Sequence, residues 1–374
     1  MPDGPVSETP GTDGREPGNP LDDAATRARL DRENMLGAVA RTPELLRDAW
    51  ARSRELTLGS AYRDATSVAV LGMGGSAIGG DLVSATFAER LRTPLAVVRD
   101  YELPAWVGPE TLVVASSFSG ATEETIAALQ SALERRCPVV ILATGGPLLE
   151  VARRAELPHV AFPGSGQPRA AIGYSLGLLC GVLERAGVLG LEDEEVDGAA
   201  EVGAWVTGAC GPDRRAEDNV AKRVAWSLVD RLPIVVGSGH LAAVARRWKT
   251  QFNENGKSAA MAEALPEAAH NTVVGFGHPE WQREQAYVVF LRGSAEHARN
   301  RLRADLLGVL LDDEHVSHET VELAGADRLG QAVAGIVTGD YVSVYLGLLY
   351  GVDPTPVGPI ARLKAALAKA KPEE

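Results

Sequence analysis

Short apolar runs alternate with longer stretches of helical periodicity along most of the chain. Runs typical of buried strands stand at 68–72 (VAVLG), 111–117 (TLVVASS) and 137–144 (CPVVILAT). Between them lie IGGDLVSATFAERL and TEETIAALQSALERR, in which apolar residues recur at helical spacing. Strands that alternate with helices indicate a parallel, doubly wound sheet. We therefore predict an α/β fold with helices on both faces of its sheet.

The same order of elements returns in the second half of the chain. Residues 232–255 (LPIVVGSGHLAAVARRWKTQFNEN) repeat strand, glycine turn and long helix. The stretch AYVVFLRGSAEHARNRLRADLLGVLLDD then follows the order of TLVVASSFSGATEETIAALQSALERR. Such an internal repeat predicts two tandem domains of one flavodoxin-like architecture.

The expected division of the chain follows its composition. Residues 1–25 are rich in Pro, Gly and acidic residues, which is typical of a disordered tail. We place an N-terminal domain with leading helices at 26–200 and a C-terminal domain at 201–374. The acidic, Gly-rich segment 187–218 is the expected connection between them, and its WVTG portion is a candidate for ordered structure.

Charge and cysteine usage narrow the class of protein. The 374 residues carry a formal net charge of −13, which argues against binding to nucleic acid or to an acidic membrane surface. Cys137, Cys180 and Cys210 lack metal-type spacing and are typical of reduced thiols in a cytoplasm. We see neither a membrane span of about 20 apolar residues nor a signal pattern, so we expect a cytoplasmic protein.

Residues 69–80 (AVLGMGGSAIGG) run from a predicted strand into glycines, a pattern that brings backbone amides close to phosphate. Gly72 and Gly74 fit a dinucleotide fingerprint in which Ala77 takes the third position, and Asp100 ends the next strand. Binding of NAD at this loop is therefore one hypothesis. A nucleoside-triphosphate loop is excluded, because no Gly-Lys-Ser/Thr follows the glycines.

A second loop favours a phosphomonoester instead. SSFSGATEET places Ser117, Ser119 and Thr122 around Gly120 where a predicted strand becomes a helix. Hydroxyls, free amides and the positive end of a helix dipole suit a phosphate group. The alternative to a phosphate site is an ordinary helix start that Thr122 caps as the N-cap residue. The second half carries only LRGSAEH at the equivalent place, so we assign phosphate binding to the first half.

These motifs resemble a known family. LGMGGSAIGGD followed by SSFSGATEET resembles the sugar isomerase (SIS) domain. PGSGQPRAAIGY, FNENGKS, PEAAHN and DPTPVGPIARLK more narrowly resemble the bifunctional phosphoglucose/phosphomannose isomerases of bacteria and archaea, in family order from about residue 30 to residue 370. The resemblance implies sugar-phosphate substrates, no metal, no cofactor and a homodimer.

The resemblance also implies roles for single residues. Those that it assigns to the sugar 6-phosphate are Gly75, Ser76, Ser117, Ser119 and Thr122. Those that it assigns to catalysis are Arg169 near C1–C2, Glu254 as base, His270 as ring opener from the neighbouring subunit, and Lys364 as the residue that closes the site. Ala121 and Gly256 depart from the family, which commonly has Asn and Ala at these positions.

Aldose–ketose isomerisation needs a base that moves a proton between C2 and C1, and donors for the enediolate oxygens. Glu254 ends a long helical pattern just before Gly256, and Glu263 and Glu267 are competing carboxylates that spacing alone does not exclude. His270 stands in a segment with little periodicity. Without the family match we would interpret His270 as an ordinary surface or core histidine.

Arg169, Lys364 and the two histidines of residues 315–319 can also be explained without any functional role. Arg169, in a Gly- and Pro-shaped loop, would stabilise an enediolate or merely cap a surface loop. Lys364 on ARLKAALAKAK would otherwise belong to a solvated helix face. The histidines of HVSHE (315–319) would share one helix face, but no third ligand is evident, so we expect no metal site.

Three functions remain open at this point. The first is isomerisation of glucose 6-phosphate, and also of mannose 6-phosphate, to fructose 6-phosphate through a cis-enediolate. The second is a sugar-phosphate-binding regulator that has lost the chemistry, and the third is an NAD-dependent oxidoreductase. The presence of Glu254, His270 and Lys364 disfavours the regulator, and the hydroxyl-rich loop disfavours the oxidoreductase.

Overall fold

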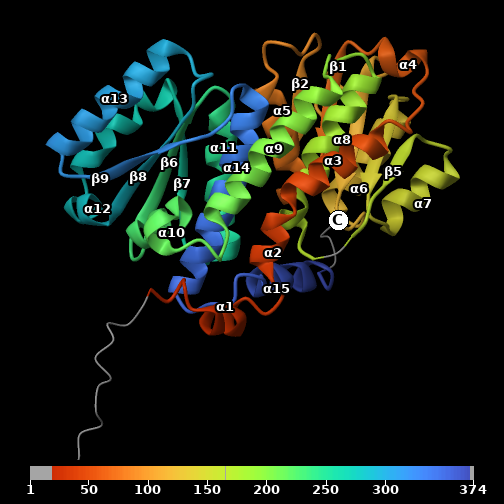
Figure 1. Ribbon diagram of the computed structural model, residues 1–374. Coiled ribbons are helices and arrows are strands. Elements are labelled where there is room, and N and C mark those ends of the chain that lie inside the picture. Colours follow the sequence, from red (N-terminus) through yellow and green to blue (C-terminus); the bar gives the residue numbers. More distant parts are fainter. Residues whose placement is uncertain (1–18, 165, 371–374) are drawn as a thin grey trace, which may run out of the picture.

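The computed structural model describes residues 19–164 and 166–370, which form two parallel sheets separated by a layer of helices (Figure 1). The first sheet has the order β2-β1-β3-β4-β5. Its strands are β1 (Ser67–Leu71), β2 (Leu95–Val98), β3 (Thr111–Ser117), β4 (Val139–Ala143) and β5 (His159–Ala161). All of its pairings are parallel, and this order is that of flavodoxin-like folds.

The second sheet has four parallel strands in the order β7-β6-β8-β9. They are β6 (Leu232–Ser238), β7 (Met261–Leu265), β8 (Ala286–Arg292) and β9 (Ser317–Glu322). In both sheets the chain reverses its direction of travel across the sheet between two central strands, β1 and β3 in the first and β6 and β8 in the second. The predicted pair of α/β halves is confirmed.

Helices cover both faces of each sheet because successive strand residues point to opposite sides. Val68 and Val70 of β1 pack into the central core, whereas Ala69 and Leu71 pack against the outer helices. The outer helices of the first sheet are α6 (Glu123–Glu134) and α7 (Gly146–Arg154), and that of the second is α13 (Ala298–Asp313).

The central layer joins the two halves. Its helices are α1 (Ala24–Leu30), α2 (Met35–Ala40), α3 (Thr42–Ser53), α5 (Gly74–Thr86), α8 (Ile172–Arg185), α9 (Asp193–Cys210), α10 (Val220–Ser227), α11 (His240–Gln251) and α14 (Arg328–Leu349). Figure 1 shows α9, α11 and α14 between the sheets. Of the described helices, α14 alone is long and apolar enough to cross a membrane, and 94% of its apolar window is buried in this core.

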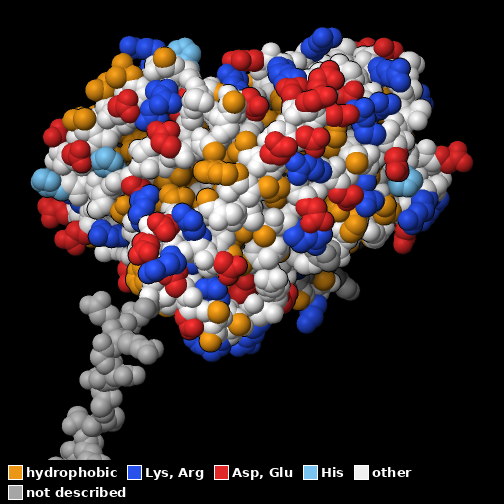
Figure 2. All heavy atoms as spheres, viewed as in Figure 1, with side chains coloured by type: hydrophobic (Ala, Val, Ile, Leu, Met, Phe, Trp, Pro, Cys, Tyr) orange, Lys and Arg blue, Asp and Glu red, His pale blue; other side chains and the backbone are white. Residues whose placement is uncertain are grey.

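The remaining elements are short or lie on the surface. They are α4 (Ser60–Arg63), α12 (Glu280–Gln285), α15 (Gly358–Leu367), the 3-10 turns η1 (Pro168–Ala171), η2 (Ala216–Asp218), η4 (Glu267–Ala269) and η5 (Thr272–Gly277), and the π-helical turn η3 (Phe252–Gly256). On the face in Figure 2, basic and acidic side chains are interspersed, and no continuous basic patch crosses the described part of that face.

The predicted tail and the predicted domain boundary can be compared with the structure only in part. Residues 1–18 of the predicted tail lie outside the described residues, but Leu21 is buried in the central core and Asp22 pairs with Lys222 at 2.8 Å. The packed chain therefore begins before residue 25. The expected boundary at residue 200 falls inside α9, whose WVTG portion is helical, and the division into domains remains a prediction.

Candidate active site

Two helix N-termini meet at the carboxyl edge of the first sheet, between β1 and β3. The chain leaves β1 and enters α5 at Gly74, and it leaves β3 through residues 118–122 to enter α6. The N-cap residues Met73 and Thr122 give no side-chain hydrogen bond to either helix. The first-turn amides of both helices therefore lack a side-chain cap, and they lie where parallel α/β sheets bind anions.

The two loops are tied to each other by the predicted hydroxyl residues. The Ser76 hydroxyl accepts a hydrogen bond from the Phe118 amide at 3.2 Å. The Ser117 and Thr122 hydroxyls are 2.8 Å apart, and Ser117 Oγ also accepts from the Gly120 amide at 3.1 Å. The exposed Ser119 accepts from the Ala121 amide at 3.2 Å. Thr122 is thus the N-cap of α6 by position, but its hydroxyl faces Ser117 rather than the helix.

Glycine is required at two positions of these loops. A Cβ on Gly75 would stand 3.0 Å from the Pro168 carbonyl oxygen, so the missing side chain lets η1 approach the first loop. Gly120 has φ +64°, and a Cβ there would lie 1.8 Å from the carbonyl oxygen of Gly145. The close approach at Gly75 places Arg169 beside the phosphate loop.

Arg169 is a buried hub that connects the two halves of the chain. Only 2% of its surface is exposed, and its guanidinium donates to Asn255 Oδ1 at 2.6 Å and to the carbonyl oxygens of Pro354 and Thr355 at 2.8 and 2.7 Å. Its Nη1 lies 3.4 Å from Glu254 Oε2. Burial lowers the pKa of Arg169, and the Glu254 carboxylate acts against that change.

Glu254 lies in the wide π turn that continues α11. The helix ends at Gln251, η3 carries the chain to Gly256, and Lys257 closes the turn with φ 54°. The Glu254 side chain keeps 28% of its surface exposed while Arg169 holds one carboxylate oxygen. It can therefore meet a bound molecule. A Cβ on Gly256 would lie 3.4 Å from Leu346 Cδ2, so the family's alanine would make only tight contact there.

A buried polar network supports Arg169 and Asn255, the residue that follows Glu254. Arg247 on α11 pairs with Asp340 on α14 at 2.6 Å and donates to the Arg169 carbonyl oxygen at 2.9 Å. Asn255 Nδ2 donates to Ser343 Oγ at 2.9 Å. Burial raises the pKa of Asp340, and the Arg247 charge opposes the rise. Sequence reasoning missed this network, although an acidic residue in the middle of a 22-residue apolar helix was a visible signal.

Lys257 is a second residue that the sequence analysis did not single out, despite its place in FNENGKS. Its ammonium donates to the carbonyl oxygens of Glu254 and Pro354, the latter at 2.8 Å. Desolvation and the Arg169 charge lower the pKa of Lys257 to about 8. The Lys257 side chain also keeps exposed surface.

His270 and Lys364 lie apart from this cluster in the single chain. His270 is exposed after η4, and Lys364 is exposed on α15, a helix without a buried residue. Within residues 19–164 and 166–370, no hydrogen bond or ion pair joins either side chain to Arg169 or Glu254. The competitors Glu263 and Glu267 bond instead to Thr272 and Asn271 of the same surface segment.

The histidines of HVSHE do not share a helix face. His315 is a turn residue with φ 57°, and His318 lies in β9, where its Nε2 is 3.0 Å from Asp312. The expected helical spacing is therefore wrong, because the polar alternation of this segment forms an edge strand. No group of three or more His, Cys, Asp or Glu side chains gathers at metal-binding distance in the described part of the chain.

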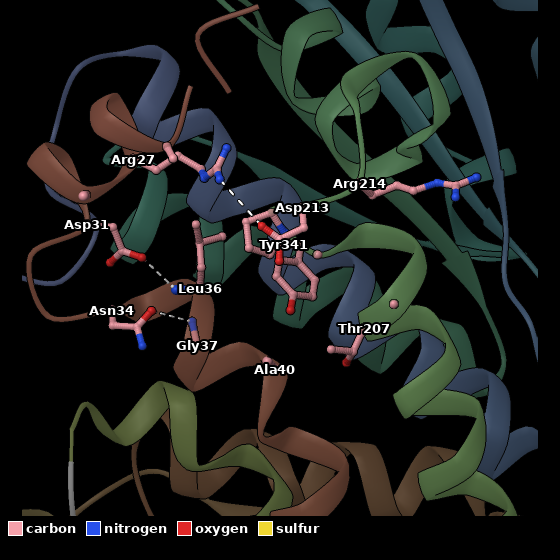
Figure 3. Close-up of a pocket in the computed structure, with 15 residues that line it drawn as sticks. Arg27, Asp31, Asn34, Leu36, Gly37, Ala40, Thr207, Asp213, Arg214 and Tyr341 are labelled. Atoms are coloured by element: carbon pink, nitrogen blue, oxygen red, sulfur yellow. Dashed lines mark hydrogen bonds and ion pairs between the residues drawn. The ribbon is translucent and has the colours of Figure 1, made fainter. Parts of the chain in front are cut away.

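Two larger cavities lie outside the cluster. A cleft of about 810 Å³ between α5 and α11 adjoins Gly74 and is crossed by an ion pair between Arg246 and Asp81 at 3.6 Å. A cavity of about 520 Å³ is formed by α1, α2, α9 and α14 (Figure 3). None of the predicted site residues lines the second cavity, where Arg27 and Asp213 approach to 3.8 Å.

Comparison with known proteins fits this geometry. Residues 61–163 match the SIS domain family, and residues 217–367 match the family described as bacterial phospho-glucose isomerase C-terminal SIS domain. A bifunctional phosphoglucose/phosphomannose isomerase of Caldicellulosiruptor bescii is 36% identical over 90% of this chain and 100% of its own length. The chain belongs to the bifunctional phosphoglucose/phosphomannose isomerase family.

Another relative and a solved structure extend this result. The Aquifex aeolicus family member is 32% identical over 80% of this chain and 89% of its own. A hypothetical protein of Thermus thermophilus has a crystal structure that matches with a TM-score of 0.74 and 18% identity, covering 94% of this chain and 95% of that one. At that identity the structure supports the tandem SIS fold alone, and the family assignment rests on the sequence relatives.

Replacing Arg169 with Lys is expected to lower the free energy of unfolding by about 2–3 kcal/mol. Lysine keeps the charge but cannot donate to Asn255, Pro354 and Thr355 together, so buried acceptors lose their partners. Urea unfolding followed by circular dichroism measures the change. Arg215→Lys, at a side chain 74% exposed, is the matched control and should shift the value by less than about 0.5 kcal/mol. Equal losses would contradict the hub role of Arg169.

The depressed pKa of Lys257 predicts a pH-dependent stability. Between about 8 and the ordinary 10.5, the unfolded chain binds a proton at Lys257 that the folded chain does not. Folding stability contributed by this group therefore rises with pH in that window. Other groups titrate there too, so the informative quantity is the difference in unfolding midpoint between the wild type and Lys257→Met from pH 7.5 to 10. A difference that stays constant would contradict the assigned shift.

Proposed function

We propose that this chain is an aldose–ketose isomerase that interconverts glucose 6-phosphate and mannose 6-phosphate with fructose 6-phosphate. The proposal rests on the proximity of a candidate anion site to the Glu254 carboxylate. Two helix N-termini without side-chain caps and the four hydroxyls of their loops stand near Gly75. Pro168 approaches Gly75, and the Nη1 of the next residue, Arg169, lies 3.4 Å from Glu254 Oε2. The names of the sequence relatives supply the substrate class.

The chemistry divides among these residues. Gly75, Ser76, Ser117, Ser119 and Thr122 would hold the phosphate group through amides and hydroxyls. Glu254 would remove the proton from C2 and return it to C1, because its carboxylate is partly exposed while one oxygen is held. The Arg169 guanidinium would stabilise the negative charge that develops on the enediolate oxygens.

Dual specificity has a physical basis in this mechanism. Glucose 6-phosphate and mannose 6-phosphate differ only at C2, and that carbon loses its configuration in the cis-enediolate. A site that accepts rotation about C2–C3 can return the proton to either face. The proposal requires no metal and no cofactor.

We also propose a cytoplasmic homodimer in which His270 and Lys364 complete the site, His270 coming from the neighbouring chain. Both side chains are exposed and unconnected to Glu254 in the described part of one chain, as a residue that serves another subunit would be. Next to the His270 segment, α13 packs against η5 and β7 and exposes an apolar stripe on its outer face (Figure 2). The stripe consists of Leu302, Leu306, Val309 and Leu310. Such a stripe suits contact with a second copy.

Solvent exchange distinguishes this reaction from its alternatives. In D₂O, proton transfer through an enediolate places deuterium at C1 of fructose 6-phosphate, whereas a hydride transfer does not. Proton NMR of the product made from glucose 6-phosphate is expected to show deuterium at C1 without added NAD. Because direct return of the proton by Glu254 competes with exchange into D₂O, the label is expected to build up over repeated turnovers. Product still free of deuterium at equilibrium would contradict the proton-transfer mechanism. Binding without conversion would favour the regulator, and a requirement for NAD would favour the oxidoreductase.

A further inference from the structure

The second sheet has its own switch point, between β6 and β8, and the same two kinds of loop leave it. β6 ends at Ser238 before α11, and β8 ends at Arg292 before the turn into α13. Counting from the strand ends, Arg292 corresponds to Ser117. The N-cap residues also correspond, since Thr122 precedes α6 and His297 precedes α13 at the same offset. By this count Glu296 stands where the first half has Ala121.

The carboxylate of Glu296 lies at the position that a bound anion would take. Its side chain is 1% exposed. Oε1 accepts from the hydroxyl of Ser238, the last residue of β6, at 2.6 Å, and Oε2 accepts from the amide of Gly293, the first residue after β8, at 2.7 Å. Arg292 Nε lies 3.4 Å from Oε2 and has no hydrogen-bond partner among the described residues. The other two nitrogens of Arg292 donate to Asp305 Oδ1 at 2.8 Å and to the Arg301 carbonyl oxygen at 3.2 Å.

Burying a carboxylate is costly unless its surroundings replace the lost water. Here they do so with a hydroxyl, a backbone amide beyond a strand end and an arginine, which are the donors that proteins use for phosphate. In the first half the positions that match Ser238 and Arg292 are Leu71 and Ser117. The Phe118 amide, which matches Gly293, donates to the Ser76 hydroxyl, and Ala121 at the place of Glu296 carries no charge. The second half thus carries a buried carboxylate beside its switch point, whereas the first half has no charged group at the matching position 121.

We propose that the second half retains a small-oxyanion site and that Glu296 occupies it as a permanent internal anion. A free phosphate is thereby excluded from the second half. The second half gains a rigid link between β6 and β8 directly before α11, the helix that leads to Glu254. This inference does not depend on the isomerase activity.

Glu296→Gly removes the internal anion and opens its place. We expect the melting temperature in Tris chloride to fall by several degrees, because the Ser238 hydroxyl, the Gly293 amide and Arg292 Nε lose the Glu296 carboxylate, although Arg292 keeps its pair with Asp305. Inorganic phosphate at matched ionic strength should raise the melting temperature of this variant by about 2–4 °C more than that of the wild type. The wild-type response corrects for phosphate bound in the first half.

Two further variants make the result specific. Glu296→Gln removes the charge but fills the space, so we expect a lower melting temperature without extra phosphate response. Asp31→Gly removes another buried carboxylate, which accepts from the Met35 and Leu36 amides but faces no arginine, and it should respond to phosphate as the wild type does.

The remaining outcomes would overturn the proposal. These are a phosphate response of Glu296→Gly equal to that of the wild type or of Asp31→Gly, recovery with acetate but not with phosphate, and a Glu296→Gly chain that stays unfolded in both buffers. If the variant folds only when phosphate is present, the proposal holds, because free phosphate then replaces the missing carboxylate.

Discussion

Replacing Glu254 with Gln is expected to lower kcat for glucose 6-phosphate isomerisation by about 10³-fold and to leave KM within a few-fold. Glutamine keeps the shape of the side chain and its approach to Arg169, but it cannot accept the proton from C2. The phosphate loops are untouched, so binding should persist. Coupled-enzyme kinetics on the purified variant, with circular dichroism to verify folding, measure the effect.

The controls for this prediction are the two carboxylates that sequence spacing could not exclude. Glu263 and Glu267 bond to Thr272 and Asn271 on the surface segment and do not contact Arg169. Glu263→Gln and Glu267→Gln should therefore retain most of kcat. If either of them loses activity while Glu254→Gln remains active, the assignment of the base to Glu254 is wrong.

Two inactive variants are expected to restore activity when they are combined. If His270 acts across a subunit boundary, a dimer of one Glu254→Gln chain and one His270→Ala chain contains one site with both functional groups. Co-expression of equal amounts should recover about one quarter of the wild-type activity, because half of the dimers are mixed and each has one intact site. Activity of the co-purified protein, compared with each variant alone, measures the recovery.

A second pair of variants controls for nonspecific rescue. Arg169 and Glu254 contact each other within one chain, so Glu254→Gln and Arg169→Met co-expressed should stay inactive. Recovery in that pair would contradict the single-chain origin of the Arg169–Glu254 unit. No recovery with His270→Ala would show that His270 does not serve the neighbouring subunit.

The fold was largely predictable because its central strands carry strong local signals. Predicted strand 111–117 is β3, and the apolar part of LPIVVGSG is β6. The strands without a prediction were β5, β7 and β9, each of which lies at the edge of a sheet. β9 (SHETVE) is polar and half-exposed, and β5 has only three residues. Edge strands need little apolar sequence, so hydrophobic patterning does not reveal them.

The candidate site was predictable in part, for a different reason. The phosphate loops are contiguous motifs, and the first of them lies against Pro168 and Arg169, while Arg169 in turn contacts Glu254. The supporting network is not contiguous: Asn255 is 86 residues from Arg169, and Thr355 is 186 residues from it. Contacts over such separations depend on tertiary packing and leave no spacing in the sequence. His270 and Lys364 are exposed, and a single chain cannot show what they face.

Isomerisation of both aldoses can be tested by direct conversion. The purified protein would be incubated in EDTA and without NAD with ¹³C-labelled glucose 6-phosphate and, separately, with ¹³C-labelled mannose 6-phosphate, and carbon NMR would follow fructose 6-phosphate. We predict product from both sugars, lost in Glu254→Gln. No product from either sugar, while both still bind, would rule out the isomerase and leave a sugar-phosphate-binding protein without this chemistry.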